Sequence, residues 1–144
     1  MEKLTEIQLL RMAYEARKKA YVPYSNHGVG AAIESADGVI FTGCNIENAA
    51  YGPTNCAERT AIFKAVSEGV RDFTRIAIVG GMMDASNLDL CAPCGVCRQV
   101  MREFCDPDSF EIILGKMSKD EVVEVKSFYL KELLPLSFGP DNLK

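Results

Sequence analysis

The start of the chain has an amphipathic pattern that predicts a helix. Apolar residues recur at intervals of three and four between Ile7 and Ala20, and charged residues fill the positions between them. Thr5 followed by Gln8 matches a capping box, which places the start of the helix here. Proline cannot continue a helix, so we expect this one to end before Pro23.

Two short β-prone runs come next, at residues 29–33 and 39–42. They flank Asp37-Gly38, a dipeptide that tolerates the positive φ angles of a hairpin turn. Residues 45–55 have the composition of a loop. The elements expected further along the chain are a helix from Cys56 to just before Gly69, a strand at 76–80, a helix from Cys94 to about Phe104, strands at 110–114 and 122–128, and a helical turn at 130–134.

Strands and helices alternate in this order, which favours an α/β fold. We predict a three-layer αβα sandwich with a mixed, mostly parallel central sheet and helices on both faces. With 144 residues, 48% of them hydrophobic and 25% charged, the chain can bury one sizeable core and reads as a single domain over residues 1–144. Its composition excludes intrinsic disorder.

Charge and apolar patterning limit the partners. The net charge of −4 and the lack of any basic block argue against a nucleic-acid polymer as ligand, although a single nucleoside needs no basic surface. The chain contains no apolar run of the roughly 18–20 residues that span a bilayer, so we expect no membrane partner. The start, Met1 to Glu6, lacks a secretion signal, so we expect a cytoplasmic protein.

Cysteines are the candidate chemical groups. In a chain without a secretion signal they indicate metal binding or catalysis rather than disulfides. Three of them precede or open predicted helices, where unpaired N–H groups favour the thiolate that a metal requires. Cys94 and Cys97 lie one turn apart on one helix, and Cys56 can complete a set of three ligands. Three thiolates and an open fourth position are typical of a catalytic zinc site.

Glu58 and two arginines extend this constellation. A carboxylate beside a zinc-bound water can move its proton, provided that the carboxylate is not itself a ligand. Residues 56 and 58 point apart on a helix, so both reach one site only if Cys56 stands at the helix mouth; Asn55 as N-cap would allow this. Three thiolates outweigh the charge of Zn²⁺, so we expect donors such as Arg59, and secondly Arg98, around the sulfurs.

Simpler interpretations remain open at this point. Cys94 and Cys97 alone could be a redox pair, and Cys91 could be a fourth ligand of a structural zinc. An iron–sulfur pattern fails because Met101 occupies the position of the required cysteine. Glu58 could complete a capping box with Asn55. The remaining cysteines are expected to be small buried side chains: Cys44, Cys91 and Cys105.

Two motifs together resemble a known family. Cys56-Ala57-Glu58-Arg59 and Pro93-Cys94-Gly95-Val96-Cys97-Arg98-Gln99 are similar to those of the small, homotetrameric, three-cysteine cytidine deaminases. The resemblance covers most of the chain, including Tyr24-Ser25, Val29–Ala32, Asn45–Tyr51, Leu133–Pro135 and Phe138.

The resemblance implies one Zn²⁺ per chain, held by Cys56, Cys94 and Cys97, with Glu58 as the catalytic proton shuttle. It implies that zinc hydroxide attacks C4 of the cytosine while Glu58 protonates N3 and ammonia leaves. The substrate-binding residues that it implies are His27, Asn45, Glu47, Asn48, Tyr51, Ala57 and Phe138.

The implied roles of these residues differ. Asn45 and Glu47 would hydrogen-bond the sugar hydroxyl, and the backbone of Ala57 would contact the base. Tyr51 and Phe138 would close pockets of neighbouring subunits, which makes the expected homotetramer part of the site. From the residues alone, the loop pair could instead cap a strand end and the aromatic pair could be packing residues.

One position departs from the family pattern. His27, the only histidine, stands where the family normally has an aromatic hydrocarbon ring that stacks on the base. Imidazole offers less stacking area and titrates near pH 6.5. The resemblance predicts deamination of cytidine and 2′-deoxycytidine in pyrimidine salvage. The departure at His27 leaves another cytosine nucleoside, of the blasticidin type, as the alternative substrate.

Overall fold

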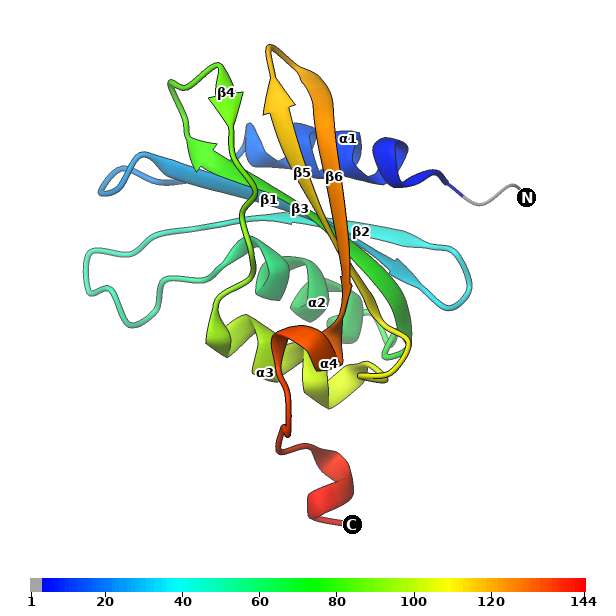
Figure 1. The fold of residues 1–144 in the computed structure, drawn as a ribbon. Helices are drawn as coiled ribbons and strands as arrows, with labels where there is room; N and C mark the ends of the chain where they lie inside the picture. Colours follow the sequence, from blue (N-terminus) through cyan, green and yellow to red (C-terminus); the bar gives the residue numbers. More distant parts are fainter. Residues whose placement is uncertain (1–3) are drawn as a thin grey trace.

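A six-stranded mixed sheet forms the middle layer of the protein (Figure 1). The computed structural model describes residues 4–144; residues 1–3, part of the stretch examined for a secretion signal, lie outside it. The elements in chain order are α1 (Glu6–Arg17), β1 (His27–Ser35), β2 (Ile40–Cys44), α2 (Ala57–Ser67), β3 (Phe73–Met82), β4 (Asn87–Leu88), α3 (Gly95–Phe104), β5 (Glu111–Ser118), β6 (Glu121–Tyr129), α4 (Leu130–Leu133) and a 3₁₀ turn (Pro140–Asn142).

The predicted α/β sandwich is confirmed, but the prediction that its sheet is mostly parallel is wrong. The strand order is β2-β1-β3-β5-β4, with β6 paired to β5. Only β3 and β5 pair in parallel; the other pairs are antiparallel. Helix α3 connects β3 to β5 and makes them parallel neighbours, as a crossover helix does. Helix α2 also connects strands of one direction, β2 and β3, but β1 lies between them and pairs antiparallel with both.

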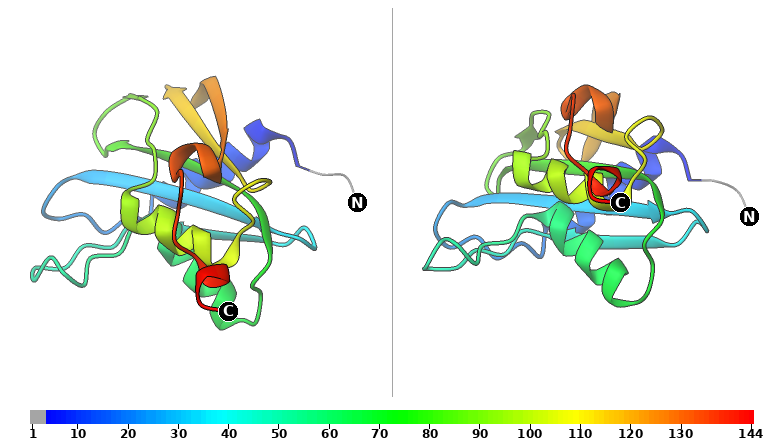
Figure 2. Two further views of the ribbon diagram at one scale, coloured as in Figure 1. Left: turned by 60° about the horizontal axis from the view of Figure 1, so that its bottom comes forward. Right: turned by 90° about the horizontal axis from the view of Figure 1, so that it is seen from below.

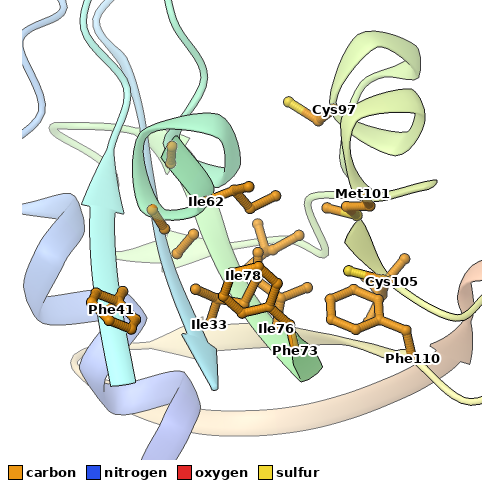
Figure 3. Packing of buried hydrophobic residues seen from close by; sticks show 14 of the residues in the cluster. Ile33, Phe41, Ile62, Phe73, Ile76, Ile78, Cys97, Met101, Cys105 and Phe110 are labelled. Carbon is orange, nitrogen blue, oxygen red and sulfur yellow. The ribbon is translucent and has the colours of Figure 1, made fainter. Parts of the chain in front are cut away.

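Helices cover both faces of the sheet and create two cores. Helix α1 lies on one face, whereas α2 and α3 lie on the other (Figures 1 and 2). Because successive strand residues point to opposite faces, Ile76 and Ile78 join the core under α2 and α3, and Ala77 joins the core under α1. In the first core, Met101 of α3 and Ile62 of α2 pack over the sheet (Figure 3). Burial of each such side chain contributes about 1.5–3 kcal/mol.

Local sequence signals explain two of the helix ends. Thr5 and Gln8 form the expected capping box at the start of α1. Gly69, with φ 91°, follows Glu68, the C-cap residue of α2, as expected of a helix stop signal. Two short elements, β4 and the 3₁₀ turn, were not expected, because two or three residues carry no periodicity.

Two further predictions concern the whole chain. Among residues 4–144, the helices are too short or too polar to cross a membrane. The assignment of residues 1–144 to one domain stays a prediction.

Candidate active site

Three cysteines meet where α2 and α3 begin. Cys56 is the N-cap of α2 and Cys94 the N-cap of α3, each with the extended backbone of that position. Cys97 lies in the first turn of α3, and its thiol points from α3 toward α2 (Figure 3). The prediction of Asn55 as the N-cap of α2 is wrong by one residue, because Cys56 occupies that position. The Asn55 side chain instead donates to Thr60 Oγ1 at 3.1 Å. The shift puts Cys56 at the helix mouth, as the site requires.

The sulfur positions fit a single zinc ion. The Cys56 and Cys94 Sγ atoms are 3.8 Å apart, those of Cys94 and Cys97 are 3.5 Å apart, and all three lie within 4.8 Å of one another. Tetrahedral zinc with Zn–S bonds of about 2.3 Å requires sulfur separations of about 3.8 Å. Three soft thiolates are a typical zinc donor set. The residues present therefore match the ion that the sequence motifs imply.

Arg59 supplies the positive charge that this sulfur cluster needs. Its Nη2 donates to Cys56 Sγ at 3.2 Å, while its Nε is buried and has no hydrogen-bond partner among residues 4–144. Hydrogen bonding from Cys97, together with Arg59, lowers the pKa of the Cys56 thiol to about 5. Cys56 is thus prepared as a thiolate ligand.

The expected contact of Arg98 with the sulfurs is not formed. Its Nε donates to the carbonyl of Pro93 and its Nη1 to that of Leu133, both at 2.7 Å. The fork geometry of the guanidinium suits two carbonyls on different segments. Arg98 therefore ties the residue preceding Cys94 to the end of α4, and its influence on the metal would pass through the backbone.

Glu58 lies beside the thiols in the first turn of α2. Its side chain is only 4% exposed, and no capping box with Asn55 forms. Burial raises the pKa of Glu58 to about 7, and the negative charge of Cys56 acts in the same direction. The group of three possible metal ligands contains the cysteines and not Glu58. A carboxyl group with this pKa, next to the metal ligands, can accept and return a proton near neutral pH.

Cys91 lies near the site without joining the sulfur cluster. The ligand group found among residues 4–144 holds Cys56, Cys94 and Cys97 alone, which leaves the fourth position of a structural zinc without a cysteine from this chain. Burial raises the pKa of Cys91 to about 11, with smaller contributions from Glu58 and Cys56. The thiol is therefore protonated at neutral pH. Cys105 is buried, and Cys44 is partly buried.

A small open pocket lies at the loop that leads into α2. Its volume is about 380 Å³. Glu47 accepts hydrogen bonds there from the backbone N–H groups of Tyr24 and Ser25, at 3.0 and 3.2 Å, and from the Ser25 hydroxyl. The contact with Ser25 lowers the pKa of Glu47, so the carboxylate is charged at neutral pH. The lining residues are Tyr24, Ser25, Glu47, Asn48, Tyr51 and Thr54.

Asn45 and His27 lie next to each other at the start of β1. Asn45 Nδ2 donates to the carbonyl of His27 at 2.8 Å, and Asn45 Oδ1 accepts from the N–H of Val29 at 2.8 Å. Asn45 therefore does cap a strand end, as the simpler interpretation allowed. Its second amide hydrogen can still meet a ligand. His27 is exposed at the end of the strand.

The other expected substrate residues occupy three separate places. Ala57 is fully buried at the first position of α2. Tyr51 is 75% exposed, has a φ of 62°, and makes an edge-on contact with Tyr24 at 6.4 Å between ring centres. Phe138 is 57% exposed in the C-terminal segment, where its carbonyl accepts from Gln99 Nε2. The structure thus brings neither aromatic ring into a closed pocket within one chain.

Some pocket residues were not among the expected site residues. Thr54 belongs to no recognisable motif. Its hydroxyl accepts a hydrogen bond from the N–H of Asn48 at 3.0 Å. Tyr24 and Ser25 belonged to the resembling segments, but nothing in the sequence connects them with Glu47, which lies more than twenty residues away.

Comparison with known proteins identifies the class and then the family. An α/β sandwich that gathers three thiols and a neighbouring non-ligand carboxyl at two helix mouths is the arrangement of a zinc-dependent deaminase. The family described as "Cytidine and deoxycytidylate deaminase zinc-binding region" matches residues 4–110. The chain belongs to the cytidine deaminase family, and its cofactor is zinc.

Similar proteins cover nearly the whole chain. This chain is 46% identical over 136 residues to a cytidine deaminase of Sporosarcina psychrophila, and the aligned region covers 94% of this chain and 93% of the relative. The crystal structure of a cytidine deaminase from Burkholderia pseudomallei superposes with a TM-score of 0.81 at 44% identity, covering 94% of this chain and all of that one. A blasticidin-S deaminase of Bacillus cereus is 33% identical, with 92% and 91% covered.

Proposed function

We propose that the protein hydrolyses the bond between C4 and the amino nitrogen of cytidine and 2′-deoxycytidine. The products are the uracil nucleosides and ammonia, and the reaction serves pyrimidine salvage. The observation that carries this proposal is the position of Glu58, buried beside the three cysteine thiols but not among the possible ligands. A structural zinc site needs no such carboxyl group. A hydrolytic site needs one to move protons.

The residues of the chain divide the chemistry between them. Cys56, Cys94 and Cys97 would hold zinc, which when bound supplies the Lewis acidity that makes water nucleophilic near neutral pH. Glu58 would accept a proton from the attacking water and deliver it to N3 of the base. A bond forms between the water oxygen and C4, the bond from C4 to the amino nitrogen breaks, and a second proton transfer releases ammonia.

Arg59 would balance the excess negative charge of three thiolates around one divalent ion. Its contact with Cys56 withdraws electron density from that sulfur, which leaves more of the metal's positive charge for the substrate side. The N-termini of α2 and α3 act in the same direction: the N–H of Cys97 donates to Cys94 Sγ, and Cys56 lies at the positive end of the α2 dipole.

The loop between β2 and α2 would bind the sugar. The charged Glu47 carboxylate can accept a hydrogen bond from a ribose hydroxyl, and Asn45 retains a free amide hydrogen. Asn48 lines the same pocket, and the Ala57 backbone would contact the base. A neutral nucleoside suits a pocket without lysine or arginine among its lining residues.

Neighbouring subunits would complete the site in a homotetramer. Tyr51 and Phe138 are large, exposed aromatic residues that find no closed pocket in their own chain, and exposed Leu136 adds to the apolar surface near Phe138. Light scattering should give about four times the chain mass of 15.8 kDa.

We propose the cytoplasm as the place of action, where the thiols stay reduced.

One experiment tests the proposed function directly. Ammonia release from cytidine is measured together with zinc content, for the wild type and for C94S and C105S. We expect one zinc per chain and turnover in the wild type and in C105S, whose cysteine lies at the far end of α3. C94S should lose both. Zinc without turnover of any cytosine nucleoside would contradict the proposal.

A second substrate class is favoured by His27. This exposed imidazole stands at the start of β1, next to Asn45, where a hydrocarbon ring would offer a larger stacking face. The similarity to a blasticidin-S deaminase supports a cytosine nucleoside with a modified sugar as the alternative. A panel of cytosine nucleosides separates the two: a higher kcat/KM for cytidine supports the first proposal, and turnover of modified nucleosides alone supports the second.

A further inference from the structure

Arg17 at the end of α1 is a buried arginine whose charge meets backbone carbonyls only. Its side chain is 4% exposed. Nε donates to the carbonyl of Gly28 at 3.0 Å, and Nη2 donates to those of Gly81 and Met82 at 2.9 and 2.6 Å. Among residues 4–144, the ion pairs include none to Arg17. A buried charge without a counter-ion is costly, so the three carbonyl dipoles must compensate for it.

These carbonyls belong to two adjacent strands near the proposed substrate pocket. In the antiparallel register of β1 and β3, Gly28 faces Gly81 and His27 faces Met82. A single guanidinium therefore holds both strands at the pair that carries His27. On the opposite edge of β1, the Asn45 side chain bonds to His27 and Val29. Arg17 and Asn45 thus hold the same few residues of β1 from two sides.

The position of Arg17 itself is fixed by close packing of α1 on β1. A methyl group at Gly30 would lie 1.9 Å from the carbonyl oxygen of Ala13 and 2.5 Å from the backbone nitrogen of Arg17. The helix therefore rests directly on the strand, without an intervening side chain. This contact fixes the backbone of Arg17 against β1. The guanidinium of Arg17 therefore determines where the bound ends of β1 and β3 lie.

We propose that Arg17 is a positioning residue for the deaminase reaction, which sets the place of His27 and Asn45, two of the residues proposed to bind the substrate. The inference rests on the proposed function, since those two residues are assigned to substrate binding there. The planar fork of arginine reaches both strands at once, whereas the ammonium group of lysine is a single point donor. Lysine at this position keeps the charge but releases one strand.

The test compares R17K with R75K. Arg75 is a matched control: it is also 4% exposed and also bridges β1 and β3, but through Glu34 at the other end of the same strands. Steady-state kinetics with cytidine give KM and kcat for the zinc-loaded enzymes. The ring-proton NMR signal of His27, the only histidine of the chain, reports its surroundings without any need for turnover.

We expect R17K to raise KM by about tenfold, which corresponds to one lost charge-assisted hydrogen bond, while kcat and zinc content change little. The His27 signal should move in R17K and stay in place in R75K. R17Q, which keeps amide donors without the charge, serves if R17K does not fold, and the same shift is expected of it.

An unchanged KM and an unmoved His27 signal in the folded variant would overturn the proposal, as would equal changes in R75K. If the wild type does not turn over cytidine, the proposed function fails, but the His27 signal still decides whether Arg17 positions this residue.

Discussion

Gly43 of β2 packs directly against the backbone of α2, and G43A tests whether this contact sets the metal site. A methyl group there would lie 2.6 Å from the carbonyl oxygen of Ala57 and 2.6 Å from the backbone nitrogen of Ala61. Both are backbone atoms of α2, so relief requires the helix to move. Ala57 follows Cys56 directly, and a displaced helix therefore displaces a proposed zinc ligand.

The magnitude follows from the packing. Overpacking of a core contact costs about 1–3 kcal/mol. If the displacement reaches Cys56, zinc affinity should fall by about tenfold or more, because one of three ligands no longer meets the tetrahedral distance. G30A is the matched control: its methyl group clashes with Ala13 of α1 on the other face of the sheet, away from the thiols. It should cost similar stability and leave zinc affinity unchanged.

Urea unfolding of the metal-free variants gives the stability change, and competition with a chromophoric chelator gives zinc affinity. G52A provides a baseline, because the nearest atom to its methyl group is 4.0 Å away. G43A with the zinc affinity of the wild type, or G30A with an equal loss of affinity, would refute the reasoning that α2 packing positions Cys56.

Two further predictions concern titration of the site and its neighbours. Burial raises the pKa of Glu58 from its usual 4.5 to about 7 in the metal-free protein, so its contribution to stability is present below pH 4.5 and is lost as the pH rises through 7. Between about pH 5 and pH 8 the metal-free wild type should lose up to about 3 kcal/mol relative to E58Q in urea unfolding, and parallel pH curves for the two would contradict this. Burial raises the pKa of Cys91 to about 11, so Cys91 should resist alkylation at pH 8 whether or not a chelator has removed zinc, whereas Cys56 should become reactive on chelation; peptide mass spectrometry reads both.

The fold was predictable where local chemistry decides it. The capping box at Thr5, the turn at Gly38 and the helix stop at Gly69 lie where the sequence places them. The place of β1 in the sheet could not be deduced in this way. Helices between strands correctly indicate that β2, β3 and β5 run in one direction, but no local signal shows that β1 lies between β2 and β3. That insertion is decided by packing between distant residues.

The site was predictable in its reactive groups and less so in their supports. Cysteine spacing and helix caps were enough to bring Cys56, Cys94 and Cys97 together. Arg98 and Arg17 show the limit of such reasoning. Both bind backbone carbonyls of segments far along the chain, and an arginine in a sequence carries no mark of which carbonyls will surround it.

The most direct measurement is made on one preparation of E58Q, in which zinc content and ammonia release from cytidine are determined together. Glutamine keeps the size of the buried side chain but cannot carry a proton between water and N3. We predict one zinc per chain, an intact fold and a rate reduced by about 10²–10⁴-fold. A zinc-loaded E58Q that releases ammonia at the wild-type rate would contradict the account of how this site works.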